Sequence, residues 1–281
     1  MRQDAVSLDT FYNTPLGELA SDVMRERIDA LWPSAAGRTV LGLGYVSPVL
    51  ASVGGDATRC CVCSPSDQGP THWKRSPNSG NASLLGDEAR LPFRDQIFDR
   101  VVLLHALEEA AAPAAILREV WRVLAPEGRV LIIAANRRGL WARAESTPFG
   151  HGRPWTRGQL TRLLSDALFQ TTAWTYALYT PPIPWTLSIS LSPVFERSGE
   201  SLRSVFGGAV MVEAVKRLYI DPAGGAPEAS PLGVAKARKG IAGAPKDKAP
   251  DAGKMRRPST ELTRPAETET VRADKNKGSM R

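Results

Sequence analysis

The chain has 281 residues, enough for one well-cored domain with a tail or for two domains of modest size. All nineteen aromatic residues lie at or before Tyr219, whereas residues 221–281 hold seven prolines and thirteen basic against eight acidic residues. This composition favours a folded domain over residues 1–220 and a disordered basic tail over residues 221–281. The tail carries +5 of the formal net charge of +7 but has no nucleic-acid-binding motif and no aromatic residue to stack on bases. Specific nucleic-acid binding is therefore disfavoured, and the positive charge suits the tail to an anionic partner.

Membrane insertion, secretion and metal binding are also disfavoured. No window of about 18 apolar residues occurs and the N-terminus has no basic and then hydrophobic signal, so we expect a cytoplasmic protein. The three cysteines, Cys60, Cys61 and Cys63, are adjacent and odd in number, which argues against a disulfide framework. No second Cys or His pair follows at ligand spacing, so we interpret them as buried strand thiols and expect no metal site.

Short apolar segments alternate with amphipathic helical patterns, which predicts an α/β domain with a seven-stranded, mostly parallel sheet flanked by helices. Helices are predicted over residues 16–31, over residues 116–124 and after a capping box formed by Thr156 and Gln159. Strands are predicted over residues 39–44, 58–63, 82–86, 100–105, 130–135, 171–179 and 209–218. Pro126 and Gly128 indicate a turn before the fifth strand.

Two loops after predicted strands carry the functional signal. The first is GLGYVSP over residues 42–48, where glycines allow the backbone to approach a ligand closely. A tight structural turn explains this loop equally well. The second is GDEARLPF over residues 86–93, followed by FDRVV over residues 98–102. Ligands of such sheets bind at the carboxyl ends of the strands, so both loops are expected at one site.

The second loop and the sequence that follows it resemble a known family. The order Asp, Leu-Pro-Phe and Phe-Asp before a strand is similar to the methyltransferase type 11 group of class I S-adenosylmethionine-dependent methyltransferases. HALE over residues 105–108, LREVWRVL over residues 117–124 and PEGR over residues 126–129 continue the likeness. It covers residues 39–169 and extends to residues 11–219. The resemblance implies a Rossmann-like class I methyltransferase fold and S-adenosylmethionine as the cofactor.

The resemblance also implies residue roles at the cofactor. Its amino-acid and ribose portion would lie over the glycine turn, through the backbone of Gly42, Gly44, Tyr45 and Ser47. The Asp87 carboxylate would accept a hydrogen bond from the adenine amino group, and Glu88 would present a backbone amide to the ring. His105 is expected to line the methyl-donor pocket, while hydrogen bonding and proton transfer remain open for it. No residue is assigned as catalytic.

The acceptor is expected to be a small, anionic molecule bound after the fifth strand. Residues 136–157 contain five arginines with one opposing acid, Glu145, and guanidinium groups suit carboxylate or phosphate. An exposed basic loop without a ligand fits these arginines as well. The candidate acceptor residues are Asn136, Arg137, Arg138, His151 and Arg153.

The departures from the family pattern keep a second function open. Gly42 stands where the family has an acidic residue, Val46 and Pro48 replace its later glycines, and the second strand ends without the usual ribose-binding acid. Asp67 is the nearest carboxylate to that position. The sequence therefore predicts an S-adenosylmethionine-dependent methyltransferase or, as the alternative, an inactive methyltransferase-like binding or regulatory module. A nicotinamide-dependent oxidoreductase lacks the third glycine and the ribose acid that it needs.

Overall fold

The computed structural model describes residues 2–71, 73, 82–183, 191–201 and 205–217. The chain divides into two units, Met1–Ala235 and Lys236–Arg281, and every described residue belongs to the first. The predicted tail over residues 221–281 lies outside the described residues.

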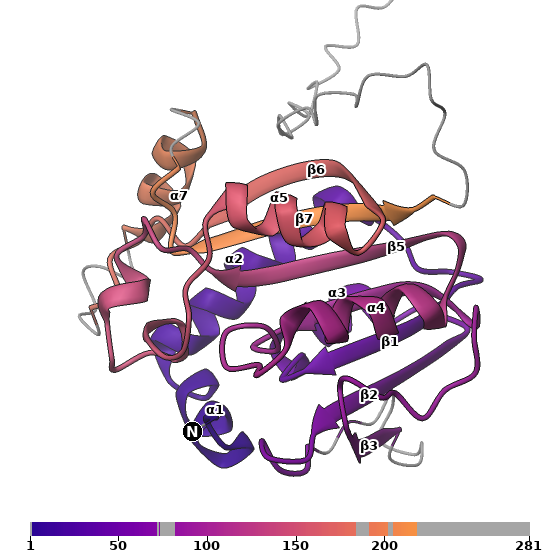
Figure 1. Cartoon of the computed structure of the whole chain (residues 1–281). Coiled ribbons are helices and arrows are strands. Elements are labelled where there is room, and N and C mark those ends of the chain that lie inside the picture. The colour runs from indigo at the N-terminus through magenta and orange to yellow at the C-terminus, as the bar shows by residue number, and fades with distance from the viewer. Residues whose placement is uncertain (1, 72, 74–81, 184–190, 202–204, 218–281) are drawn as a thin grey trace, which may run out of the picture. The chain divides into compact units, whose positions relative to one another are not determined.

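Seven strands form one sheet in the order β3-β2-β1-β4-β5-β7-β6 (Figure 1). Neighbours from β3 to β5 are parallel, and β7 is antiparallel to both β5 and β6, so the predicted seven-stranded, mostly parallel sheet is confirmed. The central strands are buried on both faces, which explains their nearly continuous apolar sequences. The strands are β1 Thr39–Gly44, β2 Arg59–Pro65, β3 Ser83–Gly86, β4 Phe98–Leu104, β5 Leu124–Ala135, β6 Phe169–Ala177 and β7 Ala209–Lys216.

Helices cover both faces of the sheet and bury two hydrophobic cores (Figure 1). Successive strand residues point to opposite faces, so Val40 packs in the core with α2 and α3 while Leu41 packs in the core with α4 and α5. The helices are α1 Ala5–Tyr12, α2 Pro15–Leu31, α3 Leu50–Gly54, α4 Pro113–Val123, α5 Arg157–Asp166 and α7 Ser192–Ser201. Single 3-10 turns lie at η1 Ser47–Val49, η2 Trp141–Arg143 and η3 Pro148–Gly150.

The three predicted helices are present as α2, α4 and α5, whereas α1, α3 and α7 were not predicted. Thr156 and Gln159 form the expected capping box of α5, and Thr14 accepts a hydrogen bond from the Gly17 amide at the start of α2. The sequence did not predict α1, an eight-residue helix capped by the Asp4 side chain. A helix of about two turns is too short for the helical repeat of apolar residues to be recognised in the sequence. Its stability comes from packing on the rest of the domain.

The predicted turn at residues 126–128 lies inside a strand instead of before it. β5 begins at Leu124, whose partner on β4 is Phe98, and regular pairing with β4 resumes only at Arg129. Glu127 within this irregularity has a φ of 60°. The extra residues therefore form a bulge that still accommodates the turn expected from Pro126 and Gly128.

Two buried charges on β7 connect the sheet to its surroundings. Glu213 accepts hydrogen bonds from Trp32 Nε1 at 2.8 Å and from Arg129 at 2.7 Å. Lys216 donates to the Leu124 carbonyl oxygen at 2.6 Å and lies 4.0 Å from the centre of the Trp121 ring. Glu213 is thus paired with the Arg129 cation, whereas the Lys216 ammonium is stabilised by a carbonyl oxygen and an aromatic face.

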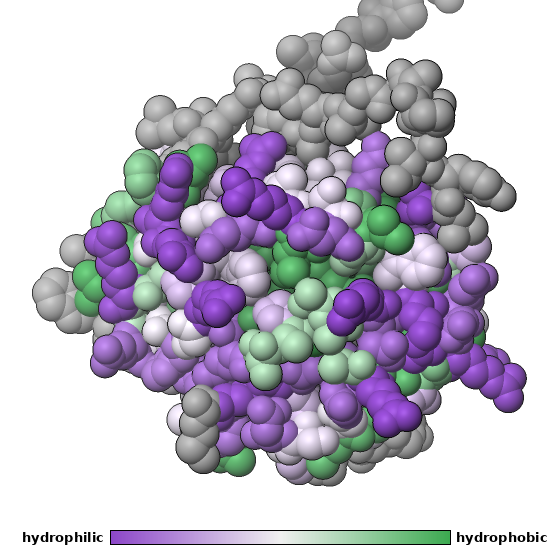
Figure 2. Space-filling view, in the orientation of Figure 1, coloured by the Kyte–Doolittle hydropathy of each residue, from purple (hydrophilic) through white to green (hydrophobic). Residues whose placement is uncertain are grey.

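The surface in the view of Figure 2 is mainly hydrophilic, with hydrophobic residues in small separate areas. Among the described residues, the helices are too short or too polar to span a bilayer. The three cysteines lie on β2 as free thiols, with Cys63 buried and the other two half-buried.

Candidate functional site

The carboxyl ends of the parallel strands place the predicted loops at one edge of the sheet. The turn after β1 contacts the end of β4, since the Tyr45 amide donates to the Leu104 carbonyl oxygen at 2.9 Å. α1 lies at the same edge (Figure 1). The candidate site is therefore bounded by the ends of β1 to β4 and by the N-terminal residues.

The turn after β1 is packed too tightly for any side chain at its two glycines. Gly44 has a φ of 87°, and a Cβ there would lie 2.4 Å from the Leu104 carbonyl oxygen. A Cβ at Gly42 would lie 2.3 Å from Val46 Cγ2, so Val46 occupies the space beside that glycine. Ser47 is half-buried at the start of η1. Both glycines are thus required by the packing of the turn itself.

The loop after β3 presents two acidic side chains in different environments. Asp87 is exposed, and its Oδ1 accepts a hydrogen bond from the Ala89 amide at 2.8 Å. Glu88 is only 14% exposed and binds the Arg2 guanidinium with both carboxylate oxygens, at 2.6 and 2.5 Å. Asp87 is accessible to a ligand, whereas both oxygens of Glu88 are already engaged.

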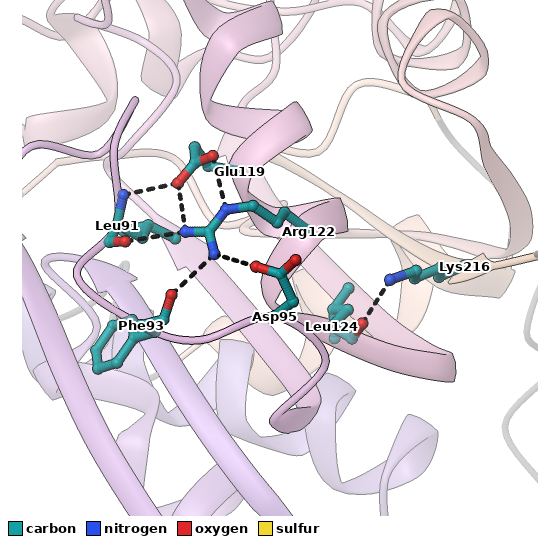
Figure 3. Close-up of polar contacts among 7 residues, drawn as sticks. All are labelled: Leu91, Phe93, Asp95, Glu119, Arg122, Leu124 and Lys216. Atoms are coloured by element: carbon teal, nitrogen blue, oxygen red, sulfur yellow. Dashed lines mark hydrogen bonds and ion pairs between the residues drawn. The ribbon is translucent and has the colours of Figure 1, made fainter.

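Arg122 of α4 holds the rest of this loop in place (Figure 3). Its five N–H groups donate to Glu119, to Asp95 and to the carbonyl oxygens of Leu91 and Phe93, at distances between 2.6 and 2.9 Å. Glu119 also accepts a hydrogen bond from the Leu91 amide, and the Arg122 hydrogen bond lowers the pKa of the Glu119 carboxyl. The loop that carries Asp87 is therefore fixed to α4 by the Arg122 guanidinium, all of whose N–H groups donate hydrogen bonds.

His105 directly follows β4 and lies in a row of aromatic rings. Its φ of 51° is left-handed, and its Nε2 is 2.7 Å from the Tyr12 Oη. Ring centroids are 5.8 Å apart for Tyr12 and Tyr45, 5.9 Å for Tyr12 and His105, and 4.9 Å for His105 and Phe149. Burial lowers the pKa of His105 to about 3, so the imidazole is neutral at physiological pH.

Glu108 is a buried carboxyl group that sequence reasoning did not select. Its Oε1 accepts a hydrogen bond from the Ala135 amide at 2.9 Å, and its Oε2 has no partner among the described residues. Burial raises the pKa of Glu108 to about 7. Glu108 lines a cavity of about 10 Å³ with residues that include Gln3, His105 and His151. The available signal was an acidic residue shortly after the apolar sequence of β4, at position 108.

The end of β2 and the residues after it place three further side chains at this edge, those of Ser64, Asp67 and Gln68. Ser64 is buried and bonded to the Thr71 hydroxyl, at 2.7 Å, so it is not exposed to a ligand. Gln68 is 1% exposed, and neither its Oε1 nor its Nε2 has a partner among the described residues. Asp67 is exposed and accepts a hydrogen bond from Arg2 at 3.0 Å. A buried amide without partners is costly, which makes Gln68 a candidate for ligand contact.

The expected acceptor residues are only partly brought together. His151 lines the Glu108 cavity, and the Arg153 amide donates to the Glu108 carbonyl oxygen at 2.7 Å. Arg137 is exposed and bonds through its guanidinium to the Pro154 carbonyl oxygen. Arg138 lies nearer β6, where its charge acts on Tyr176. Asn136 is buried, and its amide nitrogen is bonded to the carbonyl oxygens of residues 205 and 207.

Comparison with known proteins supports the same assignment of fold. The family described as a methyltransferase domain matches residues 41–132. A solved S-adenosylmethionine-dependent methyltransferase from Thermotoga maritima, a possible histamine N-methyltransferase, gives a TM-score of 0.51 at 15% identity over 74% of this chain and 94% of its own. Another from Mesorhizobium loti gives 0.50 at 15% identity over 70% and 100%. Residues 41–132 therefore match a methyltransferase-domain family, and the chain adopts the class I methyltransferase fold.

The curated relatives share only part of this chain. A demethylmenaquinone methyltransferase of Beutenbergia cavernae is 31% identical over 141 residues, which are 46% of this chain and 57% of the relative. A protein of the same name from Mycobacterium tuberculosis is 45% identical over 49 residues, 17% of this chain and 21% of the relative. This chain thus spans about a fifth to just over half the length of these relatives.

Replacing Arg122 by Lys should destabilise the folded domain by roughly 1–3 kcal/mol, because an ammonium group cannot reproduce five hydrogen bonds in a planar fork. Urea unfolding measures this loss. Arg118→Lys on the exposed side of the same helix is the matched control and should change stability by less than about 0.5 kcal/mol. Equal effects of the two substitutions would contradict a loop-fixing role for Arg122.

Replacing Glu108 by Gln should make the stability of the domain less sensitive to pH. The carboxyl group has a pKa raised to about 7 in the folded state, so its stabilising contribution is lost as the pH rises through that value. Gln still accepts the Ala135 hydrogen bond but cannot ionise. Between pH 5 and pH 8, the free energy of unfolding of the unsubstituted protein should fall by roughly 1–3 kcal/mol relative to that of Glu108→Gln. The exposed Glu18→Gln control should show no such difference.

Proposed function

We propose that the domain binds S-adenosylmethionine at the carboxyl ends of β1, β2 and β3 and transfers its methyl group to a small-molecule acceptor. The observation that carries the proposal is the convergence of the Gly44 turn and the exposed Asp87 loop at one edge of a class I methyltransferase sheet. A bound donor supplies a methyl group already activated on a sulfonium, so the protein mainly has to align it with the acceptor.

The residues at this edge fit an adenosyl ligand. The Asp87 carboxylate is accessible and suits an amino donor such as that of adenine. The unpartnered Gln68 amide lies after β2 and suits hydroxyl groups such as those of ribose, a role that Asp67 can share. Gly42, Gly44, Tyr45 and Ser47 would offer backbone groups beneath the ligand, as the family resemblance implies. The Glu88 backbone amide would face the adenine ring, as the family resemblance implies, while its side chain is paired with Arg2.

The acceptor would enter between His105, Glu108 and the segment after β5. The neutral His105 and the Glu108 carboxyl, whose pKa of about 7 allows either protonation state, can exchange a proton with a hydroxyl-bearing acceptor. His151, Arg137 and Arg153 would attract negative charge on it. The names of the curated relatives make demethylmenaquinone the first acceptor to test, in oxidised and reduced forms.

Donor binding is tested by calorimetry with S-adenosylhomocysteine. We expect binding by the intact protein and a loss of about 1–3 kcal/mol of binding free energy in Asp87→Ala, because the adenine amino group loses a charged acceptor. Asp166→Ala removes an exposed carboxylate from α5 and should leave the affinity unchanged. Absence of a binding heat with millimolar S-adenosylhomocysteine, in both the intact protein and the Asp166→Ala control, would refute the donor site.

Acceptor binding is tested by Arg153→Ala and Arg137→Ala. Each should change stability by less than about 0.5 kcal/mol, since both side chains are exposed, while methyl transfer falls about tenfold or more. Transfer to demethylmenaquinone is followed by mass spectrometry, with Arg162→Ala on α5 as the exposed control. Donor binding without transfer to any acceptor would favour a methyltransferase-like binding module, to which the altered glycine loop also points.

A further inference from the structure

Arg2 is buried although it lies close to the beginning of the chain. Its side chain is 2% exposed, and its guanidinium binds both oxygens of Glu88 and one oxygen of Asp67. Arginine is rarely buried without such partners, so the contact requires a fixed position for the neighbouring backbone. Glu88 follows β3 and Asp67 follows β2, which places Arg2 between the two strand ends where the adenosyl group would bind.

The residues after Arg2 extend this contact along the same edge. We call residues 2–12 the N-terminal strap. Its Gln3 amide donates to Glu109 Oε2 at 2.7 Å and its Ala5 amide donates to the Gln68 carbonyl oxygen at 2.7 Å. Tyr12 at its end contacts His105. The cavity left beside Gln3 has a volume of about 10 Å³, enough for a single water molecule.

We infer that the N-terminal strap and the methyl donor exclude each other, with Arg2 as the ionic latch that holds the strap closed; this inference rests on the proposed function. With Arg2 in place, its guanidinium lies between Glu88 after β3 and Asp67 after β2, where the adenosyl group would bind. The donor therefore binds only after Arg2 has left Glu88 and Asp67. Binding is governed by the fraction of molecules with an open strap.

The closed strap leaves polar groups unsatisfied, which makes opening feasible. Arg2 Nε and both polar atoms of the Gln68 side chain are buried without partners among the described residues. A ligand that bonds to Gln68 satisfies the amide. On opening, Arg2 and Glu88 both return to water, which offsets much of the attraction lost between them. The latch is accordingly reversible.

The latch is tested by comparing Arg2→Ala and Arg2→Lys with the intact protein in calorimetry with S-adenosylhomocysteine. Arg2→Ala should bind about five- to tenfold more tightly, because the ligand no longer has to displace the latch, and Arg2→Lys should lie between the two. Arg59→Ala, at the amino end of β2, removes an exposed arginine far along the strand from Asp67 and should leave the affinity unchanged.

Hydrogen exchange of the peptide spanning residues 2–12 reports on the strap directly. Without ligand, Arg2→Ala should exchange several times faster than the intact protein. Added S-adenosylhomocysteine should accelerate exchange of the same peptide in the intact protein, because its Gln3 and Ala5 amides lose their partners.

The outcomes separate the latch from the proposed function. Equal affinity of the intact protein and Arg2→Ala, or slower exchange of the strap on ligand binding, overturns the latch while leaving the donor site intact. Weaker binding by Arg2→Ala also overturns it, because Arg2 would then belong to the donor site. Absence of binding to both proteins rejects the proposed function and with it the competition.

Discussion

The close approach of the β1 turn to the end of β4 is the constraint on which the candidate site depends. Gly44 adopts a left-handed φ, and the space for a side chain there is taken by the Leu104 carbonyl oxygen. This approach sets the Tyr45 ring against Tyr12 and brings His105 to the same edge. A bulkier residue at position 44 would have to separate β1 from β4, and the loops after both strands would move with them.

Two polar arrangements hold the loops around this turn, and they differ in permanence. Arg122 uses all five donors within one helix and one loop, so it fixes the Asp87 loop from the side away from any ligand. Arg2 pairs with Glu88 across 86 residues of chain and depends on the position of an N-terminal segment. The hydrogen bonds of Arg122 thus hold the loop in one position, whereas the ion pair of Arg2 can break when the N-terminal strap moves.

Buried ionisable groups distinguish this edge from the rest of the domain. His105 and Glu108 line one small cavity, yet burial acts on them in opposite senses, lowering the pKa of the imidazole and raising that of the carboxyl. Both changes favour the neutral form. Elsewhere, Glu213 is surrounded by three hydrogen-bond donors, and their bonds outweigh burial so that its pKa is lowered. Partners therefore keep Glu213 charged, while the cavity lined by His105 and Glu108 favours uncharged groups.

The sequence by itself determined the alternation of strands and helices, the capping box of α5 and the glycine requirement at the β1 turn, because these depend on local periodicity and backbone freedom. It could not reveal the bulge in β5 or the eight-residue α1, whose stability comes from contacts with distant segments. Only the tertiary structure brought Arg2 to Glu88 and buried the Gln68 amide with no partner among the described residues. Pairing and burial of this kind arise between residues far apart in the chain. A local sequence pattern does not show which of these residues lie close together in the folded protein.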